Sequence, residues 1–187
     1  MFGQVKAARQ KETGIPCAIK IVKKRVNADF ETLRSELTTM LKVDHYGVAN
    51  LFAIYETEEE IFIVMEMIAG GNLRELFIKH DFHFSEFTVA HIMKQLVGTL
   101  VHLGSHDIVH RDIKPENLMV EKDRIEDDQK VDIKMVDFGL ASVKPPDKNL
   151  KQSGVGSRYY MAPELINKSS KGHDLKVDVW AVGVLCF

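Results

Sequence analysis

The sequence predicts an α+β protein with a strand-rich first part and a mainly helical second part. Three observations predict this class: short apolar runs near the N-terminus, a glycine-containing break at residues 69–72, and a long helical repeat beyond it. The chain has 187 residues, 45% of them hydrophobic, which allows a sizeable buried core. We therefore expect two domains, residues 1–68 and residues 69–187.

The first part contains three candidate strands and one candidate helix. Residues 17–23, 51–55 and 61–67 are short apolar runs next to charged residues, as expected for strands. Residues 29–43 carry apolar side chains at spacings of three and four, which is typical of a helix. Residues 69–72, Ala-Gly-Gly-Asn, interrupt this pattern and are interpreted as the linker between the two parts.

The second part begins with a long predicted helix after Ser85, because serine is favoured at helix N-termini. The predicted strands at 118–120 and 131–136 enclose a charged stretch, 121–132, which we interpret as a solvated loop rather than a metal site. The buried side of the helix is expected to consist of apolar residues: Phe87, Ala90, Met93, Leu96, Val97, Leu100 and Leu103.

Composition argues against several kinds of partner. The net charge of −2 provides no basic field for nucleic acid or an anionic membrane. The most apolar stretch, 61–68, is too short to cross a bilayer, and no signal peptide is recognised. Cys17 and Cys186 lie in apolar patterns and are predicted to be two buried thiols rather than a disulfide. We expect a cytoplasmic protein, with the nucleus as the alternative compartment.

Two motifs point to phosphoryl transfer. Residues 110–117 read His-Arg-Asp-Ile-Lys-Pro-Glu-Asn, and residues 137–139 read Asp-Phe-Gly. They supply a carboxylate for an incoming hydroxyl, and an amide and a second carboxylate for magnesium, a combination that this reaction requires. Fixing five residue types at ~5% usage each has odds of roughly one in three million per position, so chance is a poor explanation.

With Cys-Ala-Ile-Lys at 17–20 and Met-Ala-Pro-Glu at 161–164, these motifs resemble the eukaryotic protein kinase family over nearly the whole chain. The resemblance implies a bilobal protein-kinase-like fold, with a small β-rich N-lobe and a helical C-lobe. It implies ATP-dependent transfer of the γ-phosphoryl group to Ser/Thr hydroxyls of protein substrates, with ATP and Mg²⁺. Because the start of the glycine-rich loop is missing and the chain ends in the helix that begins near Asp178, we expect a fragment with an incomplete C-lobe.

The resemblance assigns catalytic roles to four residues. Asp112 would orient the substrate hydroxyl, which is its larger contribution because an aspartate is a weak base at neutral pH. Lys114 would neutralise the transferred group, and a lysine here is similar to serine/threonine kinases. Asn117 and Asp137 would supply oxygen ligands to Mg²⁺.

The nucleotide would be bound by residues from both parts. Lys20 would pair with the α- and β-phosphates and with Glu36, although taken alone Lys20 could equally be a surface lysine at a strand end. The adenine ring would be contacted by six residues, of which Met65 is the gatekeeper and Glu66 and Ile68 use backbone groups: Val5, Ala18, Met65, Glu66, Ile68 and Met119.

The resemblance also implies regulatory residues. Arg111 would pair with a phosphate on the activation loop and so order it. Ser153 is the candidate acceptor of that phosphate, and an unmodified loop serine is the alternative. Ser157 is expected to contact Asp112 and Lys114 through its hydroxyl.

Two scaffold contacts are also expected. Phe138 would pack with His110, Met40 and Leu51 in a hydrophobic spine. Asp178 would bind the backbone of residues 110–111.

Within the family, the chain looks most like the calmodulin-dependent and calcium-dependent group, on the basis of residues 69–73, Glu116 and residues 156–164. Calcium/calmodulin-type regulators would act through segments outside this chain, because it contains no EF-hand pattern. Glu116 mildly favours substrates with an upstream arginine, and Asn72 weakens that preference. The alternative from another class is a catalytically inactive kinase-like binding or decoy module. Retention of every chemical group argues against it.

Overall fold

The computed structural model divides the chain into two compact units, Met1–Ile68 and Ala69–Phe187, which are described separately. The residues whose structure is described are 4–24, 37, 41, 43–122, 130–138, 140–143, 157–167 and 173–187.

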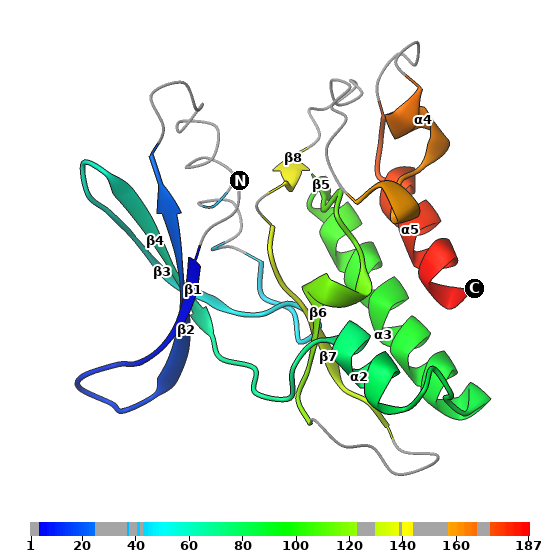
Figure 1. Cartoon of the computed structure of the whole chain (residues 1–187). Helices are drawn as coiled ribbons and strands as arrows, with labels where there is room; N and C mark the ends of the chain where they lie inside the picture. Colours follow the sequence, from blue (N-terminus) through cyan, green and yellow to red (C-terminus); the bar gives the residue numbers. More distant parts are fainter. Residues whose placement is uncertain are drawn as a thin grey trace. The chain divides into compact units, whose positions relative to one another are not determined.

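The first unit is built on a four-stranded antiparallel sheet, drawn in blue to green in Figure 1. Its strands are β1 (Gln4–Arg9), β2 (Pro16–Lys23), β3 (Leu51–Glu56) and β4 (Glu60–Glu66), in the spatial order β1-β2-β4-β3. The sequence predicted β2, β3 and β4. It did not predict β1, whose residues are almost all exposed and therefore lack an apolar alternation.

One face of this sheet carries the core of the first unit. Val22, Ile61 and Ile63 are buried there and cluster with Leu37. Leu37 belongs to the region 29–43 that was predicted to be helical, and it is helical in the structure. Most of that region lies outside the described residues.

The second unit is organised around a long helix, α3 (Glu86–Ser105), against which α5 (Lys176–Cys186) packs. Figure 1 shows α3 in green and α5 in red. The predicted start of α3 is confirmed, because the Ser85 hydroxyl accepts a hydrogen bond from the Thr88 N–H at 3.3 Å. This bond satisfies one of the backbone donors that every helix leaves unpaired in its first turn.

The predicted buried side of α3 was wrong for Phe87, Ala90 and Val97, which are exposed, Phe87 and Val97 to 50% and 51%. The buried side includes polar residues, so a stripe drawn through the apolar residues alone is rotated about the helix axis. These polar residues are tolerated because they are hydrogen-bonded, as in the Thr99 hydroxyl bond to the Gln95 carbonyl. The buried residues are Thr88, Ile92, Gln95, Leu96, Thr99 and Leu103.

A two-stranded antiparallel hairpin, β6 (Leu118–Val120) and β7 (Ile133–Met135), lies beside α3. Gln95 joins the two, since its side-chain amide donates to the Val131 carbonyl at 2.7 Å and its side-chain oxygen accepts from the Ile133 N–H at 3.1 Å. In an antiparallel pair the start of one strand meets the end of the other. The hairpin therefore brings the residue before β6 and the residues after β7 to the same end.

Four further short elements lie in the described part of the second unit. Strand β5 (Ile108–Val109) pairs with β8 (Ser142–Val143). The 3-10 helix η2 (Arg158–Tyr160) precedes the short helix α4 (Pro163–Ile166). Strand β5, helix α4 with its N-cap and helix α5 share a small core of Val109, Ala162, Leu165 and Val177.

Residues 69–72, interpreted from the sequence as a linker, pair with β6. The Gly70 N–H donates to the Val120 carbonyl at 3.0 Å, and the Val120 N–H donates to the Gly71 carbonyl at 2.9 Å. Asn72 then caps the helix α2 (Leu73–Lys79), because its side-chain oxygen accepts from the Glu75 N–H at 2.9 Å. The segment is therefore an integral part of the second unit.

Both cysteines are free thiols, and Cys17 is buried as expected. The prediction that Cys186 is buried was wrong, because it lies exposed in the last turn of α5. Among the helices the structure describes, none combines the length and the apolar character that crossing a bilayer requires.

We predict that Gly70→Ala destabilises the second unit by about 1–3 kcal/mol, because the added Cβ overpacks a backbone contact. That Cβ would lie 2.4 Å from the Val120 carbonyl oxygen, a backbone atom that cannot move away cheaply. Urea unfolding of the full-length protein measures the change. The matched control is Gly183→Ala in α5, where a Cβ meets no atom within 4 Å. It should be neutral or stabilising. Equal stability of the two variants would contradict the prediction.

Candidate active site

The loop between β5 and β6 is anchored by the carboxylate of Asp178, in the first turn of α5. This carboxylate accepts hydrogen bonds from the backbone N–H of His110 at 2.7 Å and of Arg111 at 2.8 Å. Asp178 is 3% exposed, so the two bonds form away from water, where a missing partner is costly. The predicted contact between Asp178 and this backbone is confirmed.

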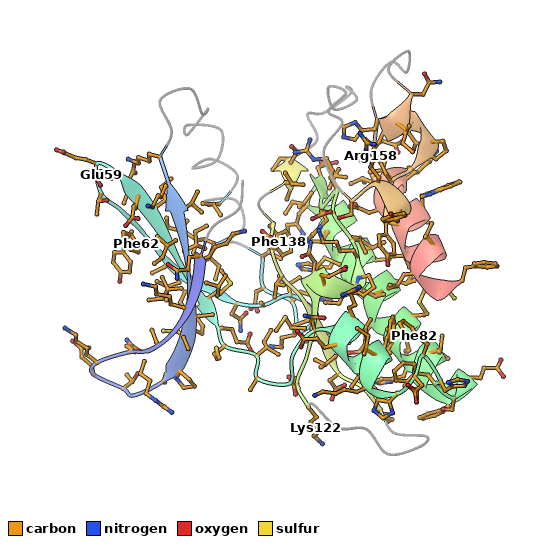
Figure 2. The ribbon with its side chains drawn as sticks, in the orientation of Figure 1. Glu59, Phe62, Phe82, Lys122, Phe138 and Arg158 are labelled. Carbon is orange, nitrogen blue, oxygen red and sulfur yellow. The ribbon has the colours of Figure 1, made fainter. Side chains whose placement is uncertain are left out.

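His110, the first residue of this loop, has a fully buried side chain. Burial lowers the pKa of the His110 imidazole, although the charge of Asp178 opposes the effect. The neutral ring matches its two neighbours, because Nδ1 lies 3.3 Å from the Asp112 N–H and Nε2 lies 3.2 Å from the Val136 carbonyl. With the proton on Nε2, one nitrogen accepts and the other donates. The ring also packs edge-on against Phe138, which is labelled in Figure 2, with centroids 4.7 Å apart, and this is the expected contact between the two residues.

Arg111 adopts a left-handed backbone conformation, with φ +66°. This conformation costs a non-glycine residue of order 1–3 kcal/mol, so surrounding contacts must hold it. The bond to Asp178 fixes its N–H, and its Nε donates to the Leu140 carbonyl at 2.5 Å. Arg111 therefore links the loop between β5 and β6, called the catalytic loop below, to the segment that follows Asp137.

The carboxylate of Asp112 is held by four donor contacts. Its Oδ1 accepts from the Ser157 N–H at 2.9 Å and from the Ser157 hydroxyl at 3.0 Å. Its Oδ2 accepts from Lys114 Nζ at 2.8 Å and from Asn117 Nδ2 at 3.0 Å. Because every partner is a donor, the arrangement suits an ionised carboxylate whose plane and position are fixed.

Lys114 and Ser157 close this arrangement from the other side. Lys114 Nζ donates to the Ser157 hydroxyl at 2.8 Å as well as to Asp112. The expected contact of Ser157 with both residues is therefore present. It joins two segments more than forty positions apart in the sequence, the catalytic loop and the start of η2.

Asn117 and Asp137 lie where the β6–β7 hairpin brings them together. Asn117 directly precedes β6, its carbonyl accepts from the Val136 N–H at 2.9 Å, and Asp137 is the next residue. The Asn117 Nδ2 is committed to Asp112, so its side-chain oxygen is the atom suited to a cation. An amide oxygen and a carboxylate fit a hard divalent cation, for which one or two protein ligands are common. Asp137 also has a left-handed backbone, with φ +59°.

Four residues assigned to the nucleotide share one face of the first unit's sheet. In the strand register Val5 lies opposite Lys20, and Ala18 lies opposite Met65. Lys20 and Ala18 are two residues apart on β2, so all four side chains point to the same side. Ile63 lies opposite Lys20 on β4, so this face also carries the buried core.

The remaining predicted contacts are distributed as follows. Glu66 ends β4, and its N–H donates to the Asn50 carbonyl at 2.8 Å. Ile68 is the last residue of the first unit. Met119 lies in β6, opposite Lys134.

Three predicted residues lie outside the described part of the chain: Glu36, Ser153 and Met40.

Sequence reasoning missed two residues close to this site. Arg74 in α2 forms an ion pair with Glu116 of the catalytic loop. His173 is 3% exposed, and its ring nitrogens have no hydrogen-bond partner within the described ranges. A motif search could not identify either, because neither belongs to a fixed pattern. The sequence around His173 is polar and charged, so nothing in it signals that this histidine is buried.

We predict that Asp178→Ala lowers the free energy of unfolding by about 1–3 kcal/mol for each N–H that loses its acceptor. Asp178→Asn keeps one side-chain oxygen and should lose less. Chemical unfolding of the full-length protein measures both changes. The control is Asp132→Ala, which removes a carboxylate that is 64% exposed and should change stability by less than about 0.5 kcal/mol. A similar effect of Asp178→Ala and Asp132→Ala would show that the anchor is unimportant.

We also predict that stability falls as the pH falls through about 6.5. Burial lowers the pKa of both His110 and His173. Below pH about 6.5, the ordinary pKa of histidine, the unfolded chain therefore binds protons that the folded chain does not. The slope should reach up to about 1.4 kcal/mol per pH unit for a fully buried histidine such as His110. Burial raises the pKa of Asp178, so this group has the opposite effect on the free energy of unfolding. Its contribution to stability falls as the pH rises above about 3.9.

Thermal unfolding between pH 5 and pH 8 measures this dependence, and His173→Gln should flatten it. A variant with the same pH profile as the original chain would exclude His173 as a contributor.

Comparison with known proteins agrees with this geometry. Residues 1–187 match the family model described as "Protein kinase domain". The chain is 37% identical over 187 residues to Calcium-dependent protein kinase 5 of Plasmodium berghei (strain Anka), covering 100% of this chain and 32% of that protein. It is 35% identical over 189 residues to Serine/threonine-protein kinase DCLK3 of Homo sapiens, covering 100% and 28%. The chain thus spans about a third or less of these relatives. It belongs to the protein kinase domain family.

Proposed function

We propose that this chain forms the catalytic core of a serine/threonine protein kinase, which transfers the γ-phosphoryl group of ATP to protein hydroxyls. The observation that carries the proposal is the four-contact arrangement around Asp112. Phosphoryl transfer depends mainly on positioning and on stabilising negative charge. A carboxylate fixed beside a lysine and an amide provides both in one place.

Asp112 positions the substrate hydroxyl by accepting its proton in a hydrogen bond. Its carboxylate has little freedom to turn, because Ser157 holds one oxygen while Lys114 and Asn117 hold the other. A fixed acceptor lowers the entropy that the reaction must lose when the hydroxyl is aligned. Asp112 therefore acts chiefly by orientation.

Lys114 stabilises the negative charge of the transferring group. Its Nζ already lies 2.8 Å from an oxygen of Asp112, so it is close to any hydroxyl bound there. ATP and a divalent metal are general requirements of protein kinases, and we propose Mg²⁺ as the metal, held by Asn117 and Asp137. When bound, the cation neutralises phosphate charge.

Most of the nucleotide contacts in this proposal come from residues of the first unit, and Met119 of β6 belongs to the second unit. Lys20 binds phosphate oxygens and pairs with Glu36. Backbone groups of Glu66 and Ile68 bind the adenine edge. The ring is packed by apolar side chains, of which the first three share a sheet face with Lys20: Val5, Ala18, Met65 and Met119.

The choice of serine and threonine substrates rests on Lys114 and on the relatives, two of which are named as a calcium-dependent protein kinase and a serine/threonine-protein kinase. We also propose that calcium-linked regulators control the enzyme. A phosphate on Ser153 would act through Arg111, whose Nε contacts the segment after Asp137.

We predict that Asp112→Asn lowers kcat by about 10²–10⁴-fold with little change in the KM for ATP, because an amide is a poor acceptor for the hydroxyl proton. Asp137→Asn should abolish transfer, because it replaces a negatively charged cation ligand by a neutral amide and so weakens binding of the metal. The measurement is γ-phosphate transfer from ATP to serine, threonine and tyrosine versions of one peptide, using the full-length protein with and without Mg²⁺.

Asp132→Asn is the matched control, since it makes the same exchange at an exposed carboxylate. Partner binding without transfer by the unaltered protein would favour the inactive module instead.

A further inference from the structure

Glu116 of the motif at residues 110–117 forms an ion pair with Arg74, a residue that belongs to none of the kinase motifs. The Nε of Arg74 in α2 lies 3.3 Å from Oε1 of Glu116. Both side chains are accessible, with exposures of 60% and 43%, so a bound peptide could reach either. Glu116 directly precedes Asn117, whose amide contacts the Asp112 carboxylate. The ion pair therefore lies beside the residues that position the substrate hydroxyl.

Both partners are held in place by their own elements. Arg74 lies in the first turn of α2, which is fixed by a reciprocal cap between Asn72 and Glu75. Gly71 permits this cap, because a Cβ there would lie 2.5 Å from the Glu75 carboxylate and φ is +86°. The cap engages the Asn72 side chain and the Glu75 carboxylate, so Arg74 is the charge that this turn directs toward Glu116.

Glu116 lies in the 3-10 helix η1 (Pro115–Asn117), which packs against α2. Pro115 and Asn117 are buried on either side of it, so the backbone at Glu116 has little freedom to move. Arg74 and Glu116 thus project from two rigid elements rather than from loops. Exposed ion pairs are usually weak because two long side chains lose entropy when they pair. Rigid placement of both backbones reduces that loss.

Tyr160 places this pair next to the peptide side of the site. It belongs to η2, three residues after Ser157, which contacts Asp112. Burial raises the pKa of the Tyr160 phenol, the charge of Glu116 raises it further, and Arg74 opposes the increase. Arg74, Tyr160 and Pro115, the residue before Glu116, line one cavity of the second unit, so the phenol lies beside the ion pair. Arg74, Glu116 and Tyr160 form one surface, which we call the flanking surface.

We propose that Arg74 determines the charge specificity of the kinase by neutralising Glu116 on the flanking surface. This inference rests on the proposed function. A peptide whose hydroxyl reaches Asp112 extends about 3.3 Å per residue, so a residue close to the acceptor meets this surface. With Arg74 present, an arginine in the peptide must compete for Glu116, and a glutamate must compete for Arg74. The unaltered enzyme therefore favours neutral flanking residues, in contrast to the arginine preference that Glu116 alone would give.

The experiment compares kcat/KM for a serine peptide carrying alanine, arginine or glutamate at each position that flanks the acceptor. The unaltered full-length protein should show little preference among the three. Arg74→Gln should raise the arginine-to-alanine ratio about two- to five-fold at one position, the range of a half-exposed ion pair. Glu116→Gln should raise the glutamate-to-alanine ratio at the same position by a similar factor. The double variant should show neither gain.

Two controls separate this effect from general changes in charge. Lys94→Gln removes a positive charge from an exposed position of α3 and should leave all ratios unchanged. The gain in Arg74→Gln should disappear at about 1 M salt, where screening acts within about 3 Å.

Two outcomes would overturn this inference alone. One is that the unaltered enzyme prefers arginine and that Glu116→Gln removes this preference. The other is that Arg74→Gln leaves the kcat/KM ratios unaltered. No transfer to any peptide by any variant would overturn the proposed function and this inference with it.

Discussion

The second unit depends most on the pair of hydrogen bonds that Asp178 accepts from the backbone of His110 and Arg111. A buried carboxylate is costly unless hydrogen bonds compensate for it, and these two bonds provide the compensation. In return they hold Arg111 in a left-handed conformation that it would not otherwise favour. The residue that follows Arg111 is Asp112, so this constraint sets the direction of the reactive carboxylate.

Around Asp112 the structure uses short-range contacts to join distant segments. Ser157 reaches it from η2, and Lys114 and Asn117 reach it from its own loop. The hairpin that begins after Asn117 also ends near Asp137, and Gln95 holds the other end of that hairpin through two buried bonds. Each functional group is thus fixed by an element that has its own packing, which is what orientation-based catalysis requires.

The flanking surface shows why charge must be judged from neighbours. Glu116 alone is an acidic residue beside the hydroxyl site, and resemblance suggests that it attracts a basic peptide. The paired guanidinium of Arg74 changes that expectation, because two opposite charges 3.3 Å apart leave a weak net field. The surroundings of His173 also determine its charge, because burial and the nearby charge of Arg111 both lower the pKa of its imidazole.

The apolar patterns of the sequence by themselves determined the fold class. Motif spacing determined the kinase family and, through that resemblance, the groups that meet at Asp112, because residue type and order identify them. Short apolar runs located β2, β3 and β4, and Ser85 located the start of α3. Tertiary structure decided the rest. The buried side of α3 contains Gln95 because a hairpin lies beside it, β1 is mostly exposed, and Arg74 meets Glu116 only when α2 packs against η1. These features arise from contacts between segments, for which a local pattern carries no signal.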